Sequence, residues 1–203
     1  MPTWNDLTRN NPSHSENYAA RWKRFVAEGK DIDGEARFVD ALSPRGAKIL
    51  DAGCGTGRAG GPLIARGHTV AGIDLDPVLI EHAKHDFPDA EWHVGDLGSA
   101  TLYEQPELGH MRGSFDVVFS VGNVLGFIDP ADRENAIENL YAPLRPGGRA
   151  VLAFGAGRGW GFGEFLDSCT AAGFAQDLLL SSFNIEPFDT DSDFLIAVLR
   201  RPR

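Results

Sequence analysis

The sequence has few of the features that accompany export, membrane insertion or metal binding. Its 203 residues include only two cysteines, Cys54 and Cys169, too few for a disulfide framework and without the C-x-x-C spacing of a zinc site. Residues 1–17 are polar, and no apolar run approaches the roughly 18 residues of a membrane-spanning helix. We therefore expect a soluble, cytoplasmic protein that has no metal and does not contact a membrane.

Positive charge is also scarce. Lys and Arg number 19 against 29 Asp and Glu, so the formal net charge is -10. A surface of this sign repels the phosphate backbone of nucleic acids, and we expect no nucleic-acid partner. The length is typical of one domain with a substantial core. The oligomeric state is left open.

Apolar segments along the chain alternate between strand-like and helix-like patterns. Strands are predicted at 48–52, 68–75, 91–94, 115–120 and 149–154. Helices are predicted at 15–28, 33–42, 59–66, 76–87, 129–144 and 163–172, two of them beginning with an Asp-Pro pair. Two further strands, 177–185 and 193–200, are joined by a link too short for a crossover helix, so they should form an antiparallel hairpin.

This alternation is typical of βαβ units whose parallel sheet is covered on both faces. The sequence therefore predicts a three-layer, Rossmann-like α/β fold. Its sheet should be seven-stranded and mostly parallel, with one antiparallel strand in the C-terminal hairpin. We divide the single domain into an N-terminal helical cap, residues 1–46, and a ligand-binding core, residues 47–203.

A glycine-rich loop, Asp51-Ala-Gly53-Cys-Gly55-Thr-Gly57, follows the first strand of the predicted sheet. It stands where a strand passes into a helix, which is where open α/β sheets bind their ligands. Glycines there let the backbone approach a ligand closely and adopt positive φ. The alternative is a tight turn that packs helix on strand, although a bare turn needs one glycine and not three.

Acidic residues stand at the ends of the next two predicted strands. Asp74 ends the second strand, where a carboxylate can accept hydrogen bonds from both ribose hydroxyls of an adenosine group. Asp96 lies just beyond the third strand, where it can accept from the amine of adenine, or can be a solvated loop acid. The pattern therefore favours an adenosine-containing ligand.

Residues 55–60 also satisfy G-x-G-x-x-G, the dinucleotide fingerprint, so an NAD-dependent oxidoreductase is an alternative. Three observations favour another cofactor. An acid precedes the first glycine, the alternating glycines end at Gly57, and the sheet is predicted to end in a reversed hairpin. No Tyr-x-x-x-Lys pair for hydride transfer follows.

Five segments together resemble the class I S-adenosylmethionine-dependent methyltransferases. They are Ile49-Leu-Asp-Ala-Gly-Cys-Gly-Thr-Gly57, Gly72-Ile-Asp-Leu-Asp-Pro77, Gly95-Asp-Leu97, Phe115-Asp-Val-Val-Phe119 and Leu144-Arg-Pro-Gly-Gly148. The resemblance covers about residues 48–200. It implies a methyltransferase fold, S-adenosylmethionine as cofactor with S-adenosylhomocysteine as product, and a small-molecule acceptor. A non-catalytic S-adenosylmethionine-binding protein is the other alternative.

The resemblance also implies a cofactor site. Gly53, Gly55 and Gly57 would surround the methionine part, and Asp51 would anchor the loop and favour the ammonium group. Asp74 would bind the ribose, next to Leu75, while Asp96 and the Leu97 amide would read adenine. Ser120 and Gly122 would border the sulfonium. Cys54 is included in the site as a small packing residue, because no partnering base is identifiable for it.

The acceptor site has a weaker signal, because methyl transfer to a nucleophile can proceed largely by positioning the two reactants. Segment 120–127 has no Asn-Pro-Pro-Tyr, which counts against adenine-N6 in DNA as the acceptor. Candidates for orienting the nucleophile are Asn123, His14 and Tyr18. Candidates for binding the acceptor are Tyr18, Arg21 and Trp22 of the first predicted helix, Asn123, and Arg158 and Trp160.

Arg158 and Trp160 lie in the glycine-rich segment 155–163, which is predicted to be either a mobile flap or a flexible connector. If it is a flap, Arg158 favours an acidic acceptor, because a guanidinium group binds a carboxylate through two hydrogen bonds. Two metal-like patterns are set aside. Segment 189–193 imitates a calcium loop but has Phe194 at the glycine position, and His82 with His85 has no third ligand.

Overall fold

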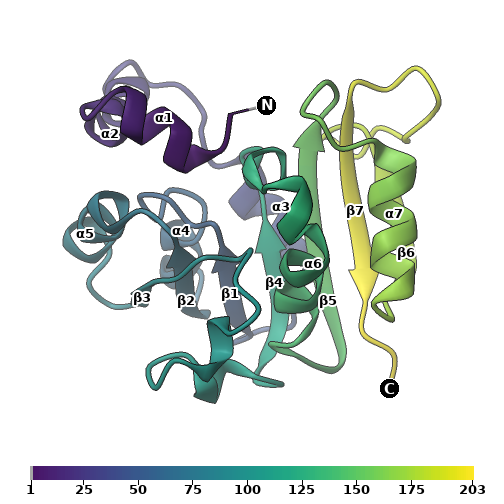
Figure 1. Cartoon of the computed structure of the whole chain (residues 1–203). Helices are drawn as coiled ribbons and strands as arrows, with labels where there is room; N and C mark the ends of the chain where they lie inside the picture. The colour runs from purple at the N-terminus through teal and green to yellow at the C-terminus, as the bar shows by residue number, and fades with distance from the viewer. Residues whose placement is uncertain (1) are drawn as a thin grey trace.

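The computed structural model describes residues 2–203, which form one twisted sheet between two layers of helices (Figure 1). The strands are β1 Lys48–Ala52, β2 Thr69–Asp74, β3 Glu91–Val94, β4 Phe115–Ser120, β5 Leu144–Gly155, β6 Ala175–Leu180 and β7 Phe194–Arg200. Their order in the sheet is β3-β2-β1-β4-β5-β7-β6, and β7 pairs antiparallel with both of its neighbours. The seven-stranded, mostly parallel sheet with one reversed strand confirms the predicted fold class.

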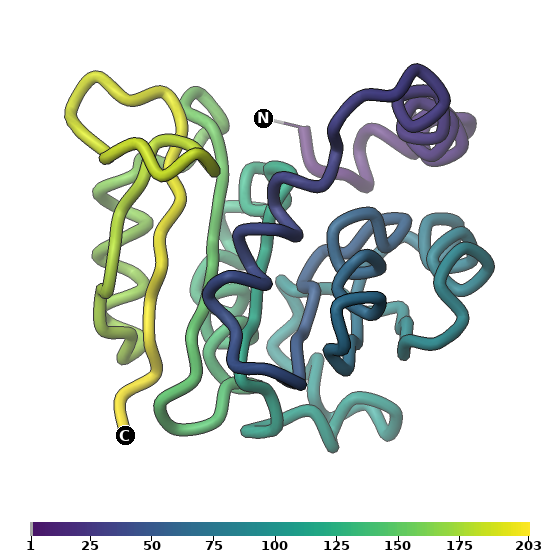
Figure 2. The backbone as a smooth tube through the Cα atoms, turned by 180° about the vertical axis from the view of Figure 1, so that it is seen from behind, coloured from purple at the N-terminus to yellow at the C-terminus, as the bar shows by residue number. Residues whose placement is uncertain are grey.

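The helices are α1 Trp4–Asn10, α2 His14–Ala27, α3 Gly34–Leu42, α4 Gly61–Ala65, α5 Pro77–Asp86, α6 Arg133–Tyr141 and α7 Phe162–Ala171. Alternate residues of the central strands enter two separate cores, as the pleat requires. Leu152 and Phe154 of β5 pack with α6 and α7 on the face shown in Figure 1. Val151 and Ala153 belong to the core beneath α3, α4 and α5, on the face shown in Figure 2.

Differences from the predicted elements have local causes. The helix predicted to reach Leu144 ends at Tyr141, because Pro143 cannot continue it, and Leu144 already pairs with Phe115 in the sheet. Its predicted start is instead a 3-10 turn, Pro130–Asp132. The helix predicted at 59–66 is shorter, since the glycine loop continues as turns as far as Gly60.

The first helix, α1, was not predicted. It has only seven residues and contains few apolar side chains. Its signal in the sequence is a capping box, in which the Thr3 side chain accepts from the Asp6 amide and the Asp6 side chain accepts from the Thr3 amide.

Helices α1 and α2 lie beyond the carboxyl ends of β1, β2 and β3, at the top of Figure 1. No helix in the described part of the chain is long and apolar enough to cross a membrane.

Candidate cofactor-binding site

The glycine loop leaves β1 with three glycines in the left-handed region of backbone conformation. Gly53, Gly55 and Gly57 have φ of 84°, 54° and 74°, values that side chains disfavour. A Cβ atom on Gly53 would also lie 2.5 Å from the Val124 side chain. The loop therefore needs glycine for its conformation and, at Gly53, for close packing.

Asp74 holds this loop against the end of β2. Its Oδ2 accepts from the Gly55 amide at 2.8 Å, and its Oδ1 accepts from the Asp76 amide at 2.9 Å. Burial raises the pKa of Asp74 to about 6, although the two backbone hydrogen bonds oppose that shift. The carboxylate is therefore largely ionised at neutral pH, and each of its oxygens can accept a further hydrogen bond from a ligand.

Asp51 lies beneath the loop and is 1% exposed. Its Oδ2 is buried and accepts no hydrogen bond from the residues that the structure describes. Burial raises the pKa of Asp51 to about 8, while the Arg58 charge and the nearby Gly60 amide oppose the shift. An unpartnered buried carboxyl oxygen is costly, and a cationic donor near the loop would relieve that cost.

A cavity of about 350 Å³ opens at the carboxyl edge of the sheet beside this loop. Most of the predicted cofactor residues line it: Gly53, Gly55, Asp74, Leu75, Asp96, Leu97 and Gly122. The others are buried behind the wall: Asp51, Cys54, Gly57 and Ser120. Burial raises the pKa of the Cys54 thiol well above its usual value, which agrees with a packing residue.

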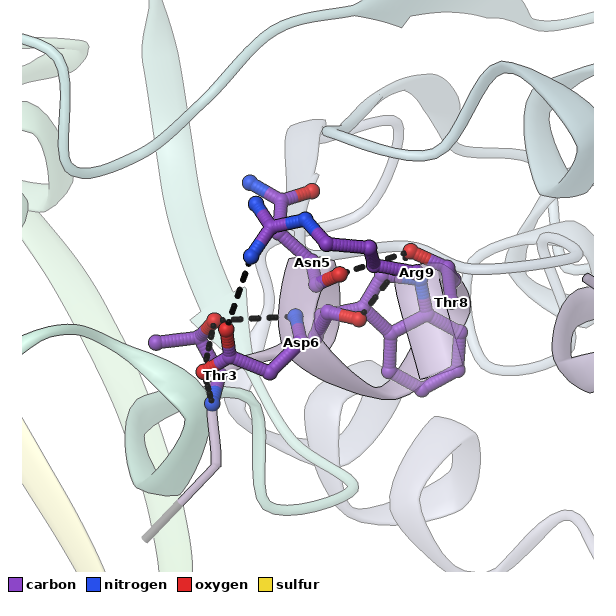
Figure 3. A network of polar contacts seen from close by, with 6 residues as sticks. Thr3, Asn5, Asp6, Thr8 and Arg9 are labelled. Carbon is purple, nitrogen blue, oxygen red and sulfur yellow. Dashed lines mark hydrogen bonds and ion pairs between the residues drawn. The ribbon is translucent and has the colours of Figure 1, made fainter. Parts of the chain in front are cut away.

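Helix α1 forms the roof of this pocket, which the sequence did not indicate. Thr3, Trp4, Asn5, Asp6 and Arg9 all line the pocket. Figure 3 shows the network that fixes the start of the helix, with Arg9 paired to Asp6 at 3.3 Å.

Asp76 fastens this roof to the core. Its Oδ2 accepts from the indole of Trp4 at 2.7 Å and from the hydroxyl of Ser15. Its Oδ1 accepts from the Val78 amide at 2.9 Å and so caps α5. One buried carboxylate thus joins α1, α2 and α5 next to Asp74.

Of the three residues predicted to orient a nucleophile, Tyr18 lines the pocket. Burial raises the pKa of Tyr18, so its phenol stays protonated at neutral pH. His14 packs edge-on against Trp4, with ring centroids 4.8 Å apart. Asn123, at φ 68°, accepts from the Gly155 amide at 2.9 Å and so joins the ends of β4 and β5. Neither His14 nor Asn123 lines the pocket.

The remaining acceptor candidates lie apart from the pocket. The Arg21 guanidinium stacks on the rings of Tyr18 and Trp22. The Arg158 side chain packs against Gly126, where an added Cβ atom would lie 2.8 Å from the Arg158 Cβ. Trp160 is 3% exposed.

Trp160 belongs to the core and not to a cover over the acceptor, because its ring packs against Phe154 and Phe165. Arg133 also donates to the Gly159 carbonyl at 2.6 Å. The segment predicted as a flap or connector is therefore anchored at this point.

Arg58, directly after the loop, was not among the predicted residues. Its Nη1 and Nη2 donate to the two carboxylate oxygens of Glu35 at 3.1 and 2.8 Å, and Nη1 also donates to the Ile32 carbonyl. The guanidinium lies over the Trp22 ring, 4.1 Å from its centroid. Arg58 therefore ties α2 and α3 to the glycine loop, a pairing that no spacing in the sequence indicates.

The pocket has a strongly negative lining. Its charged residues are one arginine, Arg9, and five aspartates: Asp6, Asp74, Asp96, Asp129 and Asp132. Such a field favours a cationic group, and the sulfonium of S-adenosylmethionine is one. Residues 2–203 contain no group of three or more His, Cys, Asp or Glu side chains placed to hold a metal ion.

The chain is similar to known methyltransferases. The family model described as a methyltransferase domain matches residues 49–148. A solved TehB-like SAM-dependent methyltransferase from Corynebacterium glutamicum is 50% identical, with a TM-score of 0.87, and the match covers 94% of this chain and 100% of that one. A SAM-bound amino pentose methyltransferase from Micromonospora echinaspora shares the fold, with 21% identity, 90% and 96% coverage and a TM-score of 0.67.

The curated relatives differ in what their names say they methylate. Ribosomal RNA small subunit methyltransferase C of Chromohalobacter salexigens is 31% identical over 68% of this chain and 45% of its own length. A dTDP-3-amino-3,4,6-trideoxy-alpha-D-glucopyranose N,N-dimethyltransferase of Streptomyces venezuelae is 29% identical over 66% of this chain and 52% of its own length. The chain thus spans about half the length of these curated relatives.

Proposed function

The chain belongs to the S-adenosylmethionine-dependent methyltransferases, and from that premise we propose that its methyl acceptor is a small molecule. The observation that carries the proposal is the roof over the pocket. Helix α1 contributes residues from Thr3 to Arg9 to the lining of a cavity of about 350 Å³, near the lower end of the range for small-ligand sites. A pocket covered in this way restricts access to the methyl group and so favours a small acceptor over a polymer.

The residues that line the pocket fit the cofactor. S-adenosylmethionine supplies an activated methyl group on its sulfonium. We assign the ribose hydroxyls to Asp74, and the adenine to Asp96 and the Leu97 amide. The Asp96 Oδ1 accepts from the Gly98 amide at 2.8 Å, which leaves Oδ2 for the adenine amine. The backbone of Gly53 and Gly55, which lines the pocket, would face the methionine part.

Asp51 supports this assignment from behind the loop. Its buried Oδ2 has no hydrogen-bond partner among residues 2–203, and burial raises its pKa despite the nearby Arg58 charge. A positive charge near the loop would lower that pKa and stabilise the ionised form. The ammonium group of the cofactor has the required charge.

Positioning is the proposed source of the rate enhancement. Tyr18 lines the pocket close to the glycine loop, since a Cβ atom added to Gly55 would lie 3.7 Å from the Tyr18 hydroxyl oxygen. Because burial raises its pKa, Tyr18 is suited to donate a hydrogen bond and orient the acceptor, and not to remove a proton. Tyr18 would suffice for an acceptor whose nucleophile is already deprotonated, because such a nucleophile needs no base.

Family membership removes the oxidoreductase alternative, because the 50% identical relative is a SAM-dependent methyltransferase. Two further expectations stay part of the proposal. The acceptor is not nucleic acid, since the pocket lining and the net charge are both negative. The location is the cytoplasm and not a membrane surface, since both cysteines are free and buried.

A methyl-transfer screen tests the proposal. The full chain is incubated with methyl-tritiated S-adenosylmethionine and separate pools of small amines, thiols, phenols and carboxylic acids, with ribosomal RNA as a further arm. We expect label in a small-molecule pool, and none in that pool with the Asp74→Ala variant. Label in RNA alone would contradict the small-molecule acceptor. Binding of the cofactor without label in any arm would favour the non-catalytic alternative.

A further inference from the structure

A second cavity lies at the amino edge of the sheet, where its parallel strands begin. The cofactor pocket lies at the other ends of these strands, the carboxyl edge. It is a groove of about 460 Å³ where β5 begins and β7 ends, toward the bottom of Figure 1. Its charged lining consists of four arginines and one aspartate: Arg145, Arg149, Arg200, Arg203 and Asp116. On a chain with a net charge of -10, this is a local concentration of positive charge.

The register of the sheet creates part of this concentration. Arg149 of β5 and Arg200 of β7 are direct partners across the antiparallel pair. Like charges directly opposite one another destabilise a sheet unless a counter-charge lies between them. Asp177 of β6 supplies one, with its carboxylate oxygens 3.3 Å from the Arg149 Nε and 3.1 Å from the Arg200 Nε. One carboxylate thus serves two guanidinium groups, and an uncompensated positive charge remains.

These contacts also fix the direction of the guanidinium groups. Arg149, Arg200 and Arg145 are each held to an acid through Nε. The Arg200 terminal nitrogens make no hydrogen bond within residues 2–203, and the Arg149 Nη1 reaches only the Leu42 carbonyl, at 3.5 Å. Anchored guanidinium groups with free terminal nitrogens are well suited to binding the oxygens of an anion.

We propose that this groove binds a small, multiply charged oxyanion of the phosphate type. A compact anion can contact several of the arginines while staying within the groove. A long polyanion would extend onto the surrounding surface, where the excess of acids on this chain would repel it. The site is separate from methyl transfer, and the proposal does not depend on the acceptor.

Calorimetry with inorganic tripolyphosphate tests the proposal. The full chain is saturated with S-adenosylhomocysteine, so that the cofactor pocket is occupied, and titrated at low ionic strength without divalent cations. We expect one saturable site. Arg149→Gln and Arg200→Gln should each weaken it about tenfold, through loss of a charge-assisted hydrogen bond. Absence of saturable binding, or wild-type affinity in both variants, would overturn the proposal.

Asp177→Asn provides a variant with an effect of opposite sign. Removing this carboxylate takes away a negative charge beside the groove, so tripolyphosphate should bind severalfold more tightly. A general loss of fold would weaken binding and so cannot imitate this result. Arg24→Gln is the matched control, since Arg24 is also an exposed arginine paired with one acid, Glu28, but lies on α2. Weaker binding in Asp177→Asn, or an equal loss in the control, would reject the site.

The source of the phosphate groups is tested with the same protein. ATP that binds more tightly than tripolyphosphate would identify a nucleotide site, and equal affinity would identify the phosphate chain alone as the ligand. A single-stranded RNA is the third titrant. If RNA displaces tripolyphosphate and binds more tightly than either small anion, the groove is a nucleic-acid surface and the proposal of a small oxyanion is wrong.

Discussion

The two edges of the sheet have opposite charge. At the carboxyl edge, the cofactor pocket has five aspartates and one arginine in its lining, and at the amino edge the groove has four arginines and one aspartate. A cationic sulfonium suits the first environment and an oxyanion suits the second. The net charge of -10 is a sum over the whole chain, so it describes the local charge at neither edge. The local charge at each edge therefore decides which ligand can bind there.

The edges also differ in how deeply their charges are buried. The ion pair of Arg58 and Glu35 at the carboxyl edge has side chains 9% and 20% exposed. The pair of Arg145 and Asp116 at the amino edge has side chains 50% and 22% exposed. Buried charges shift pKa values and affect stability strongly, whereas exposed pairs are screened by water and salt. Equivalent substitutions at the two edges should therefore have unequal effects.

The largest difference is expected for loss of an arginine from each pair. Arg58→Met removes a guanidinium group that is 9% exposed, together with its hydrogen bonds to Glu35 and to the Ile32 carbonyl, and should lower the free energy of unfolding by about 3–5 kcal/mol. Arg145→Met should lower it by at most about 1 kcal/mol, because the Arg145 side chain is half exposed and its charge is screened by water. Urea unfolding followed by circular dichroism measures both. Similar midpoints for the two variants would mean that burial does not distinguish the edges.

Next in size is the loss of the Asp74 carboxylate. Two charge-assisted hydrogen bonds to ribose contribute about 1.5–3 kcal/mol each before desolvation, so Asp74→Ala should weaken S-adenosylhomocysteine binding about 100-fold or more. Asp74→Asn retains one acceptor oxygen and should lose less. Asp177→Ala, at the amino edge, should leave the affinity unchanged in the same calorimetric titration. Wild-type affinity in Asp74→Ala would mean that the ribose assignment is wrong.

The pH dependence of cofactor binding should be smaller than that loss. The pKa of Asp74 is about 6, so its carboxylate is ionised at pH 7 and protonated at pH 5, where it accepts less well. S-adenosylhomocysteine should therefore bind about tenfold more weakly at pH 5 than at pH 7. Asp51, whose pKa is about 8, is mostly protonated in the ligand-free protein at both pH values, and loss of its proton on binding would change the affinity in the same direction.

Stability of the ligand-free protein should respond to Asp74 in the opposite sense. A raised pKa favours the protonated carboxyl in the folded state, so the contribution of Asp74 to stability falls as pH rises from 3.8 to about 6. Binding, by contrast, strengthens over the same range. Asp74→Asn should remove both dependences near pH 6. A binding transition that persists in this variant would assign the titration to another group.

The sheet and two of the acids that line the pocket could be predicted from the sequence because their signals are local. The strand 48–52 was predicted with the bounds that the structure has, since a short apolar run ends at a glycine loop. Asp74 and Asp96 followed from topology, because both stand where a parallel strand ends beside that loop. Each of these predictions depends on residues that lie close in the sequence to the position predicted.

Features that depend on distant contacts could not be predicted. Helix α1 is held by the bond from Trp4 to Asp76, 72 residues apart in the chain. The pairing of Arg58 with Glu35 across 23 residues depends on how α3 packs on the loop. Trp160 lies in the core, although the glycine-rich segment around it predicts an exposed side chain. The positive groove depends on the register of β5 with β7, which composition does not contain.

The smallest effect is expected for the bond that fastens the roof of the pocket. Trp4→Phe keeps an aromatic ring against Tyr18 but removes the N–H group that donates a hydrogen bond to Asp76. The Ser15 hydroxyl still donates to that carboxylate. We expect S-adenosylhomocysteine to dissociate about fivefold faster in stopped-flow fluorescence, because the Asp76 carboxylate keeps its other two donors and only about 1 kcal/mol of the lost bond is felt. Trp22→Phe is the matched control, since the Trp22 N–H has no partner in the described chain. An equal acceleration in the control would show that ring size, and not the bond to Asp76, governs release from the carboxyl edge.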